Sequence, residues 1–190
     1  NKNLVTFNGK PLIYWTINAA KKSKLISKIV VSTDSTAIKK FSEKVGIKID
    51  QLRPKSLSKD TSPTIDVIHY ELEKINTKKF FPDYVITLQP TSPLRNEFHI
   101  DKAIRMICKD KNADSLVSCV KIPHNYSPES LMIKSDNYLV NSKFHEKIFR
   151  RQEKKTYYAR NGAAIYITKS SKIPKFLFGY TSDIFAKRSR

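Results

Sequence analysis

Residues 84–95 have the sequence YVITLQPTSPLR, and this stretch decides the fold that the sequence predicts. Its first part, YVIT, is rich in β-branched and aromatic residues, which is typical of a buried strand. Pro90 and Pro93 follow, and each proline fixes a backbone φ angle and removes a hydrogen-bond donor, so the strand ends in a rigid loop. In open α/β sheets, ligands bind at the carboxyl ends of strands. Residues 89–95 are therefore a candidate binding loop, with a plain proline-stiffened connection as the alternative.

Strand and helix patterns alternate on both sides of this loop. Four helices are expected, near residues 11–24, 35–45, 64–75 and 100–108. Strands are expected at residues 29–31, 47–49, 84–88, 115–119 and 163–167. Ser35 or Asp34 is the expected N-cap of the second helix, and Gly46 is its expected end. This alternation is typical of βαβ units, so we expect a single α/β domain whose mostly parallel sheet carries helices on both faces.

The alternation stops after Val120. Residues 121–160 contain two short β-like pieces, at 131–133 and 138–140, among Pro, Asn and Ser residues. We interpret this segment as an excursion from the sheet that packs on a partner subunit, or as an irregular connection. A long polar loop at residues 53–63 is a second interruption, and loops of that length within compact domains are usually functional.

The chain is strongly basic. Its 190 residues include 36 Lys and Arg against 17 Asp and Glu, a formal net charge of +19. Such a balance attracts phosphate-rich partners: nucleotides, nucleic acid or an anionic membrane surface. Most lysines are scattered over the expected helices, as on a solvated face, and the sequence has no nucleic-acid-binding motif. The charge by itself does not choose among these partners, and we expect a solvated basic face rather than a nucleic-acid-binding one.

Compartment and redox state follow from what the sequence lacks. It shows no run of about twenty apolar residues and no signal peptide, so we expect a cytoplasmic protein with no membrane partner. Cys108 and Cys119 have no metal-binding spacing. We expect both to be buried free thiols, as in a reducing cytosol.

The residues available for chemistry are suited to holding a phosphorylated ligand. There is no catalytic triad, zinc-binding spacing or Walker loop, and the four histidines have structural or solvated roles by default. Cations, amides and hydroxyls at strand ends remain. Phosphoryl and nucleotidyl transfer need little more than positioning and charge stabilisation.

The chain resembles the CMP-sialic acid synthetases, or acylneuraminate cytidylyltransferases, over essentially its whole length. Seven segments keep that family's order and spacing: KN at 2–3 with NGKPLI at 8–13, VVSTD at 30–34, LRP at 52–54, DT at 60–61, LQPTSPLR at 88–95, RQ at 151–152 and RNGA at 160–163. The resemblance implies a three-layer α/β fold of the Rossmann-like nucleotide-diphosphosugar transferase type.

The resemblance also implies a nucleotide-binding set. Lys2 corresponds to the catalytic lysine that grips the triphosphate, and Asn3 to a residue that contacts the nucleotide's sugar. Arg53, Ser62 and Thr64 resemble the loop that recognises cytosine. This chain departs from the family there, because it has Pro63 and Thr64 where two serines are usual.

An acceptor-binding set is implied in the same way. The amide of Gln89 can both donate to and accept from sugar hydroxyls. Arg151, with its neighbour Arg150 as a competitor, matches the arginine that pairs with the sugar-acid carboxylate, a task that suits a planar bidentate donor. The remaining members of the set are Arg160, Asn161 and Tyr166.

The implied reaction is transfer of CMP from CTP to the anomeric hydroxyl of a nonulosonic acid, with release of pyrophosphate, Mg²⁺ as cofactor and no protein nucleophile. The implied assembly is a homodimer in which residues 121–160 reach the other subunit. The family's N-terminal phosphate loop and C-terminal Asp-x-Asp metal motif have no match in residues 1–190, so we expect an internal portion of a longer enzyme.

Two alternatives stay open. The nearer one is CTP-dependent activation of another acid sugar: pseudaminic, legionaminic or 3-deoxy-octulosonic acid. The further one is a non-catalytic module that binds polyanions through its basic surface.

Overall fold

The computed structural model describes residues 2–76, 80–144, 150, 152, 155–160, 162 and 164–173. Contacts divide the chain into two compact units, Asn1–Leu116 with Ala163–Arg190 and Val117–Gly162, and each is described by itself. In the described ranges, no helix is long and apolar enough to cross a membrane.

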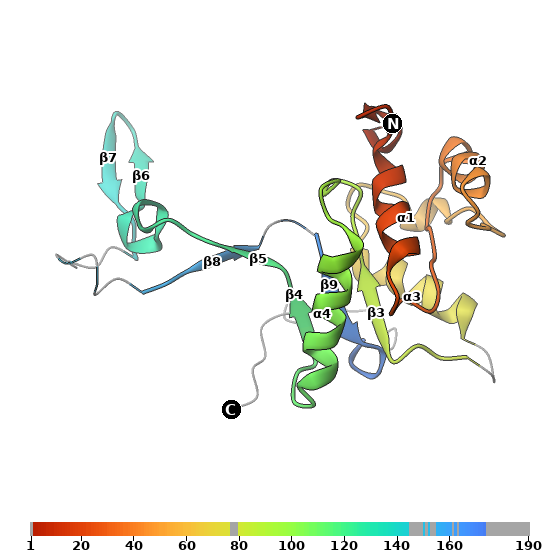
Figure 1. Cartoon of the computed structure of the whole chain (residues 1–190). Helices are drawn as coiled ribbons and strands as arrows, with labels where there is room; N and C mark the ends of the chain where they lie inside the picture. The colour runs from red at the N-terminus through yellow and green to blue at the C-terminus, as the bar shows by residue number, and fades with distance from the viewer. Residues whose placement is uncertain are drawn as a thin grey trace. The chain divides into compact units, whose positions relative to one another are not determined.

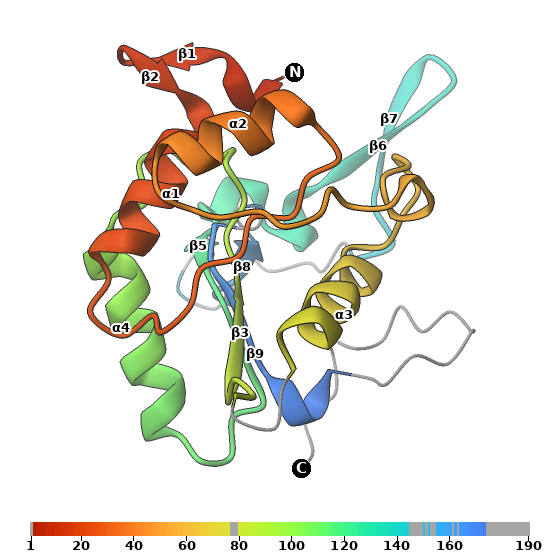
Figure 2. The same cartoon turned by 90° about the vertical axis from the view of Figure 1, so that its right-hand side faces the viewer.

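The first unit has a small sheet with helices on both sides. Strand β9 (Tyr166–Lys169) lies between β3 (Tyr84–Thr87) and β4 (Ser115–Val117) (Figure 1). β3 and β9 run antiparallel, with Thr87 opposite Tyr166. In Figure 2, helices α1 (Leu12–Lys22) and α4 (Glu97–Lys109) lie on one side of β3, and α3 (Thr64–Ile75) lies on the other. This layered arrangement confirms the α/β class that the sequence predicts.

The core lies where α1 and α4 pack on the sheet. Helix α4 presents Ile100, Ala103 and Ile107 on one face, and each is at most 7% exposed. These side chains pack against Ala19 of α1 and Ile167 of β9. The spacing i, i+3, i+7 is that of one helical face, so the expected helix near 100–108 is confirmed.

A second cluster joins α1 to α2 (Thr36–Lys44). It consists of Ile13, Ile17, Ile38 and Ile47. Ser35 is the N-cap of α2, as predicted, because its hydroxyl accepts a hydrogen bond from the Ile38 backbone N–H at 3.4 Å.

Two of the expected strands are not strands in the structure. Residues 29–31 and 47–49 are extended, yet neither segment belongs to a strand ladder in the described residues. A strand requires a neighbour at hydrogen-bonding distance as well as a β-prone composition. The expected strand at 115–119 is divided between β4 and β5 (Cys119–Lys121). A short β1 (Thr6–Phe7) and β2 (Lys10–Pro11) form an additional antiparallel pair before α1.

The second unit consists of two antiparallel strand pairs and short 3₁₀ turns. β5 pairs with β8 (Tyr158–Arg160), and β6 (Met132–Ser135) pairs with β7 (Tyr138–Asn141). The last two strands confirm the β-like pieces expected there. Turns at His124–Tyr126 and Pro128–Ser130 support them, and the Tyr157 hydroxyl hydrogen-bonds to the largely buried Glu129.

The cysteine prediction is partly wrong. Both thiols are free, as expected, but Cys108 and Cys119 are exposed rather than buried. Cys108 lies on α4 next to the buried Ile107 and lines the open cavity, and Cys119 lies on β5, whose residues are all exposed.

Candidate functional site

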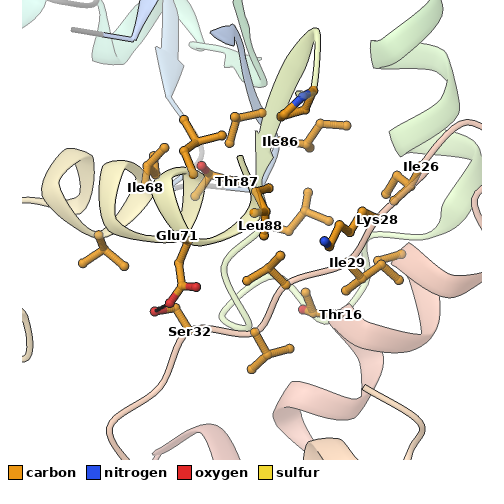
Figure 3. Close-up of a pocket in the computed structure, with 18 of the residues that line it drawn as sticks. Thr16, Ile26, Lys28, Ile29, Ser32, Ile68, Glu71, Ile86, Thr87 and Leu88 are labelled. Carbon is orange, nitrogen blue, oxygen red and sulfur yellow. Dashed lines mark hydrogen bonds between the residues drawn. The ribbon is translucent and has the colours of Figure 1, made fainter. Parts of the chain in front are cut away.

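A cavity of about 850 Å³ lies in the first unit, where it runs along β3 and past the carboxyl end of that strand. Its walls come from α1, residues 25–34, the loop at residues 53–64, α3 and β3 (Figure 3). Five of the predicted site residues line it: Asn3, Arg53, Ser62, Thr64 and Gln89. The structure thus brings together residues of the nucleotide-binding set and one of the acceptor-binding set.

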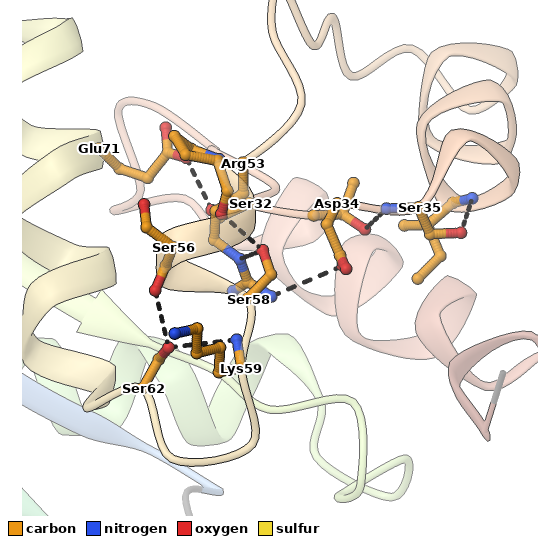
Figure 4. A network of polar contacts seen from close by, with 12 residues as sticks. Ser32, Asp34, Ser35, Arg53, Ser56, Ser58, Lys59, Ser62 and Glu71 are labelled. Carbon is orange, nitrogen blue, oxygen red and sulfur yellow. Dashed lines mark hydrogen bonds and ion pairs between the residues drawn. The ribbon is translucent and has the colours of Figure 1, made fainter.

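Arg53 is fixed at the cavity wall by contacts with residues 33–34 and with its own loop (Figure 4). Its backbone N–H donates to the Thr33 carbonyl at 2.7 Å, and its Nε donates to the Ser58 hydroxyl at 3.1 Å. The guanidinium also lies 3.8 Å from Asp34 Oδ1. Its side chain is 23% exposed, so a part of the guanidinium stays accessible to a ligand.

Ser62 closes the polar loop on itself. Its hydroxyl donates to the Ser56 carbonyl at 3.2 Å and accepts from the Lys59 backbone N–H at 3.2 Å (Figure 4). Helix α3 begins immediately after, at Thr64, and its N-cap Pro63 makes no side-chain capping hydrogen bond. Helices leave their first backbone N–H groups without intrahelical partners, so this end of α3 carries partial positive charge at the cavity wall.

Asn3 and Lys2 belong to a 3₁₀ turn, Lys2–Leu4. Asn3 Oδ1 is buried and accepts no hydrogen bond from the described residues. An acceptor buried without a partner is unfavourable, and a ligand donor would relieve it. Lys2 is exposed and does not line the cavity.

Gln89 follows β3, and hydrogen bonds to its main-chain carbonyl hold it in place. Its carbonyl accepts hydrogen bonds from Arg95 Nη1 at 3.2 Å and Thr16 Oγ1 at 3.5 Å, and its side chain is exposed at the cavity wall. Tyr166 lies on the neighbouring strand, opposite Thr87.

The rest of the acceptor-binding set lies elsewhere in the chain. Arg160 is part of β8 in the second unit, opposite Cys119. Arg151 and Asn161 lie outside the described residues.

The sequence reasoning gave no role to three polar residues: Ser32 and Glu71, which line the cavity, and Arg95, which does not line it but holds Gln89. Glu71 accepts a hydrogen bond from the Ser32 hydroxyl at 2.7 Å (Figure 3), and it also accepts one from Lys74 Nζ at 3.2 Å. Glu71 is the neighbour of Leu72, which belongs to the apolar face of α3. A carboxylate next to that face was the feature of the sequence that could have indicated its role. Arg95, the third, is only 6% exposed, and no periodicity indicates its burial.

The cavity also separates two chain segments that lack a strand between them. Apolar side chains of residues 26–31 form one wall and those of β3 form the opposite wall (Figure 3). In the described part of the chain, β3 pairs with β9 along one edge only, and no backbone hydrogen bond joins residues 26–32 to β3. Both segments therefore carry backbone donors and acceptors without strand partners.

The described residues do not fit a protein-held Mg²⁺ site. No group of three or more His, Cys, Asp or Glu side chains in the described ranges is placed to hold a metal ion. Three carboxylates line the cavity, Asp34, Glu71 and Asp83, and the first two are paired with Arg53 and Lys74.

Comparison with known proteins assigns the family. Residues 1–190 match the cytidylyltransferase family. The chain belongs to that family. An N-acylneuraminate cytidylyltransferase of Streptococcus agalactiae is 30% identical over 98% of this chain and 44% of that protein. A post-translational flagellin modification protein B of Campylobacter coli is 34% identical over 89% of this chain and 71% of that protein.

A further relative of the chain is a longer protein with a different name. A Helicobacter pylori protein, pseudaminic acid cytidylyltransferase and UDP-2,4-diacetamido-2,4,6-trideoxy-beta-L-altropyranose hydrolase, is 29% identical over 90% of this chain. The chain spans only 32% of that protein's length and 44% of the streptococcal protein's length.

A solved structure supports the fold of the chain. CMP:2-keto-3-deoxy-manno-octonic acid synthetase in complex with CTP is similar, with a TM-score of 0.66 over 90% of this chain and 68% of that one. The two sequences are 18% identical, so this similarity shows the fold alone. It confirms the predicted Rossmann-like α/β fold.

Proposed function

We propose that this cytidylyltransferase transfers CMP from CTP to the anomeric hydroxyl of a nonulosonic acid of the sialic type and releases pyrophosphate. One observation carries the proposal. Asn3, Arg53, Ser62, Thr64 and Gln89 come from three separate chain segments (residue 3, the loop at 53–64 and residue 89), yet they line one cavity beside β3. Cytidylyltransferase family membership supplies the reaction class.

In the proposed nucleotide-binding end, the polar loop at residues 53–64 contacts the cytosine. Arg53 offers guanidinium N–H groups from a fixed position, and the loop offers hydroxyl and backbone groups beside it. Asn3 Oδ1, which no described donor reaches, accepts from a ribose hydroxyl. Lys2, exposed in the same turn, neutralises charge on the triphosphate.

At the proposed acceptor end, Gln89 hydrogen-bonds to sugar hydroxyls. The anomeric oxygen attacks the α-phosphorus, and the bond from this phosphorus to the β-phosphate bridging oxygen breaks, so pyrophosphate leaves with the electron pair. The proton of the anomeric hydroxyl is released to solvent, so the products are the CMP-sugar, pyrophosphate and one proton. Arg151, Arg160, Asn161 and Tyr166 complete the proposed acceptor-binding set. No side chain forms a covalent bond, so catalysis depends on positioning and charge.

We also propose that the space between residues 26–32 and β3 takes one further extended segment of polypeptide. Such a strand would pair with both walls and cover their apolar side chains. Residues 1–190 alone are then expected to show no CTP turnover.

Two copies of the chain are proposed to associate through the β6–β7 hairpin. Its two-residue turn joins strands whose residues are all exposed, and neighbouring strand residues point to opposite faces. Both faces carry large apolar side chains, with Met132, Ile133, Tyr138, Leu139 and Val140 between 44% and 74% exposed. Ile133→Lys with Leu139→Lys should convert a dimer to a monomer in light scattering after gel filtration.

Pyrophosphate release tests the reaction. The full-length gene product is given CTP and, separately, N-acetylneuraminic, pseudaminic, legionaminic or 3-deoxy-octulosonic acid, with UTP in place of CTP as the control. We expect release that requires an acid sugar and CTP, that identifies the preferred sugar, and that EDTA abolishes. Absence of release with every sugar, together with salt-sensitive RNA binding and no thermal shift with CTP, would establish the polyanion-binding alternative instead.

A further inference from the structure

Arg95 is a buried cation that joins three parts of the first unit. Its Nη1 donates to the carbonyls of Gln89, at 3.2 Å, and Ala164, and its Nη2 donates to the Thr16 hydroxyl at 2.8 Å. Thr16 lies on α1, Gln89 follows β3, and Ala164 precedes β9. The side chain is 6% exposed and forms no ion pair with a carboxylate of the described residues.

The chemistry of these contacts requires an arginine. Its planar guanidinium presents five N–H donors in a fixed fork, whereas the ammonium of lysine is a compact point charge. Burial lowers the pKa of Arg95 to about 10, so the guanidinium stays charged near neutral pH. A buried charge is tolerated only while hydrogen bonds replace its hydration. The three acceptors must therefore stay within reach of the guanidinium.

The backbone of Arg95 is fixed as well. Its N–H donates to the Ser92 carbonyl at 3.2 Å, and the next residue, Asn96, is the N-cap of α4. Asn96 and His99 form a reciprocal capping box, with hydrogen bonds of 3.2 and 3.3 Å between them. The start of α4 thus fixes the backbone of Arg95. The guanidinium of Arg95 in turn holds the proline loop and the chain before β9.

We propose that Arg95 is a positioning residue that fastens the Gln89 loop and the Ala164 segment to α1, and thereby sets the geometry of the acceptor end of the cavity. The part that concerns the acceptor rests on the proposed function. Arg95 does not touch the substrate, because its guanidinium is buried. It acts through Gln89, whose carbonyl it holds, and through the start of β9, which carries Tyr166.

Amide hydrogen exchange of the substrate-free protein tests the fastening. Arg95→Lys keeps the charge, Thr16→Val removes one acceptor without changing the side-chain shape, and Arg105→Lys changes an exposed arginine of α4 as the matched control. We expect faster exchange at residues 89–94 and 164–167 in Arg95→Lys, a smaller increase in Thr16→Val, and wild-type exchange in Arg105→Lys. Unchanged exchange at both segments in Arg95→Lys, or an equal increase in α2, would overturn the proposal.

Kinetics test the consequence for the acceptor. In Arg95→Lys we expect the KM for the acid sugar to rise at least about tenfold, while the Kd for CTP changes by less than about threefold. Equal losses for CTP and acceptor, or a wild-type acceptor KM, would refute an acceptor-specific role. A wild-type protein that turns over no acid sugar would refute the proposed function and the acceptor part of this inference, and the exchange measurement would still decide whether Arg95 fastens the loops.

Discussion

Replacing Arg53 by methionine separates two roles that this arginine could have: contacting the nucleotide and supporting the loop that contacts it. The substitution removes the Nε hydrogen bond to Ser58 at 3.1 Å and the 3.8 Å ion pair with Asp34, but it keeps the backbone hydrogen bond to Thr33. Asp34 is 52% exposed, so the ion pair contributes at most about 1 kcal/mol.

The stability cost of Arg53→Met is correspondingly modest. A hydrogen bond from a charged donor contributes about 1.5–3 kcal/mol when buried, and partial exposure lowers that value. We expect a total loss of about 1–2 kcal/mol, which shifts Tm by about 2–8 °C in a protein of this size. Ser58→Ala removes the same loop contact without removing the charge. Lys55→Met removes an exposed cation from the same loop and is the matched control for charge.

Calorimetric titration with CTP then discriminates between the two roles. If Arg53 contacts CTP, Arg53→Met should weaken binding at least about tenfold, or about 1.4 kcal/mol, with much smaller effects of Ser58→Ala and Lys55→Met. Equal weakening by Arg53→Met and Ser58→Ala would show that the arginine only supports the loop. Equal weakening by Lys55→Met would show that only net charge matters. Either result would refute the placement of Arg53 in the nucleotide-binding end.

Three further outcomes are expected. Gln89→Glu loses the amide donor and adds a charge that repels a sugar acid, so the acceptor KM should rise at least about tenfold in initial-rate assays while CTP affinity stays unchanged. Ile100→Ala opens a cavity at a fully buried core position and should lower the free energy of unfolding by about 2–5 kcal/mol in urea titrations, whereas Met106→Ala, on the exposed side of α4, should change it little. The hydrogen bond from Ser23, and a weaker one from the Lys24 backbone, hold the pKa of Asp101 below its usual value. This carboxylate therefore contributes fully to the stability of the fold above about pH 4, and the contribution is lost as pH falls through its lowered pKa. In thermal melts between about pH 2.5 and 6, the wild type should lose stability more steeply on acidification than Asp101→Asn. Equal slopes for the two proteins would contradict this prediction.

Local patterns predicted the helices well, because a helix satisfies its backbone hydrogen bonds within its own segment. The apolar face of α4 and the Ser35 cap of α2 needed only neighbouring residues. Strands were predicted less well for the converse reason. Residues 29–31 have a strand-like composition, but whether they pair depends on a neighbouring segment that no local pattern reveals.

The candidate site divides in the same way. The resemblance named Asn3, Arg53 and Gln89, and in the structure all three line one cavity. It gave no role to Arg95 or Glu71, whose importance comes from contacts with residues distant in sequence. Arg95 reaches Thr16 across 79 positions, and Glu71 reaches Ser32 across 39.

The sequence by itself determined the helices, the proline loop after β3, the positive charge and the cytidylyltransferase family, since each of these is carried by neighbouring residues or by short motifs in order. Only the tertiary structure decided which polar groups share a cavity, that Arg95 is a buried cation while Cys108 is exposed, and that residues 26–32 lie opposite β3 without pairing to it. These properties depend on which distant segments become neighbours, because burial and strand pairing are set by the surrounding chain and not by a residue's own type.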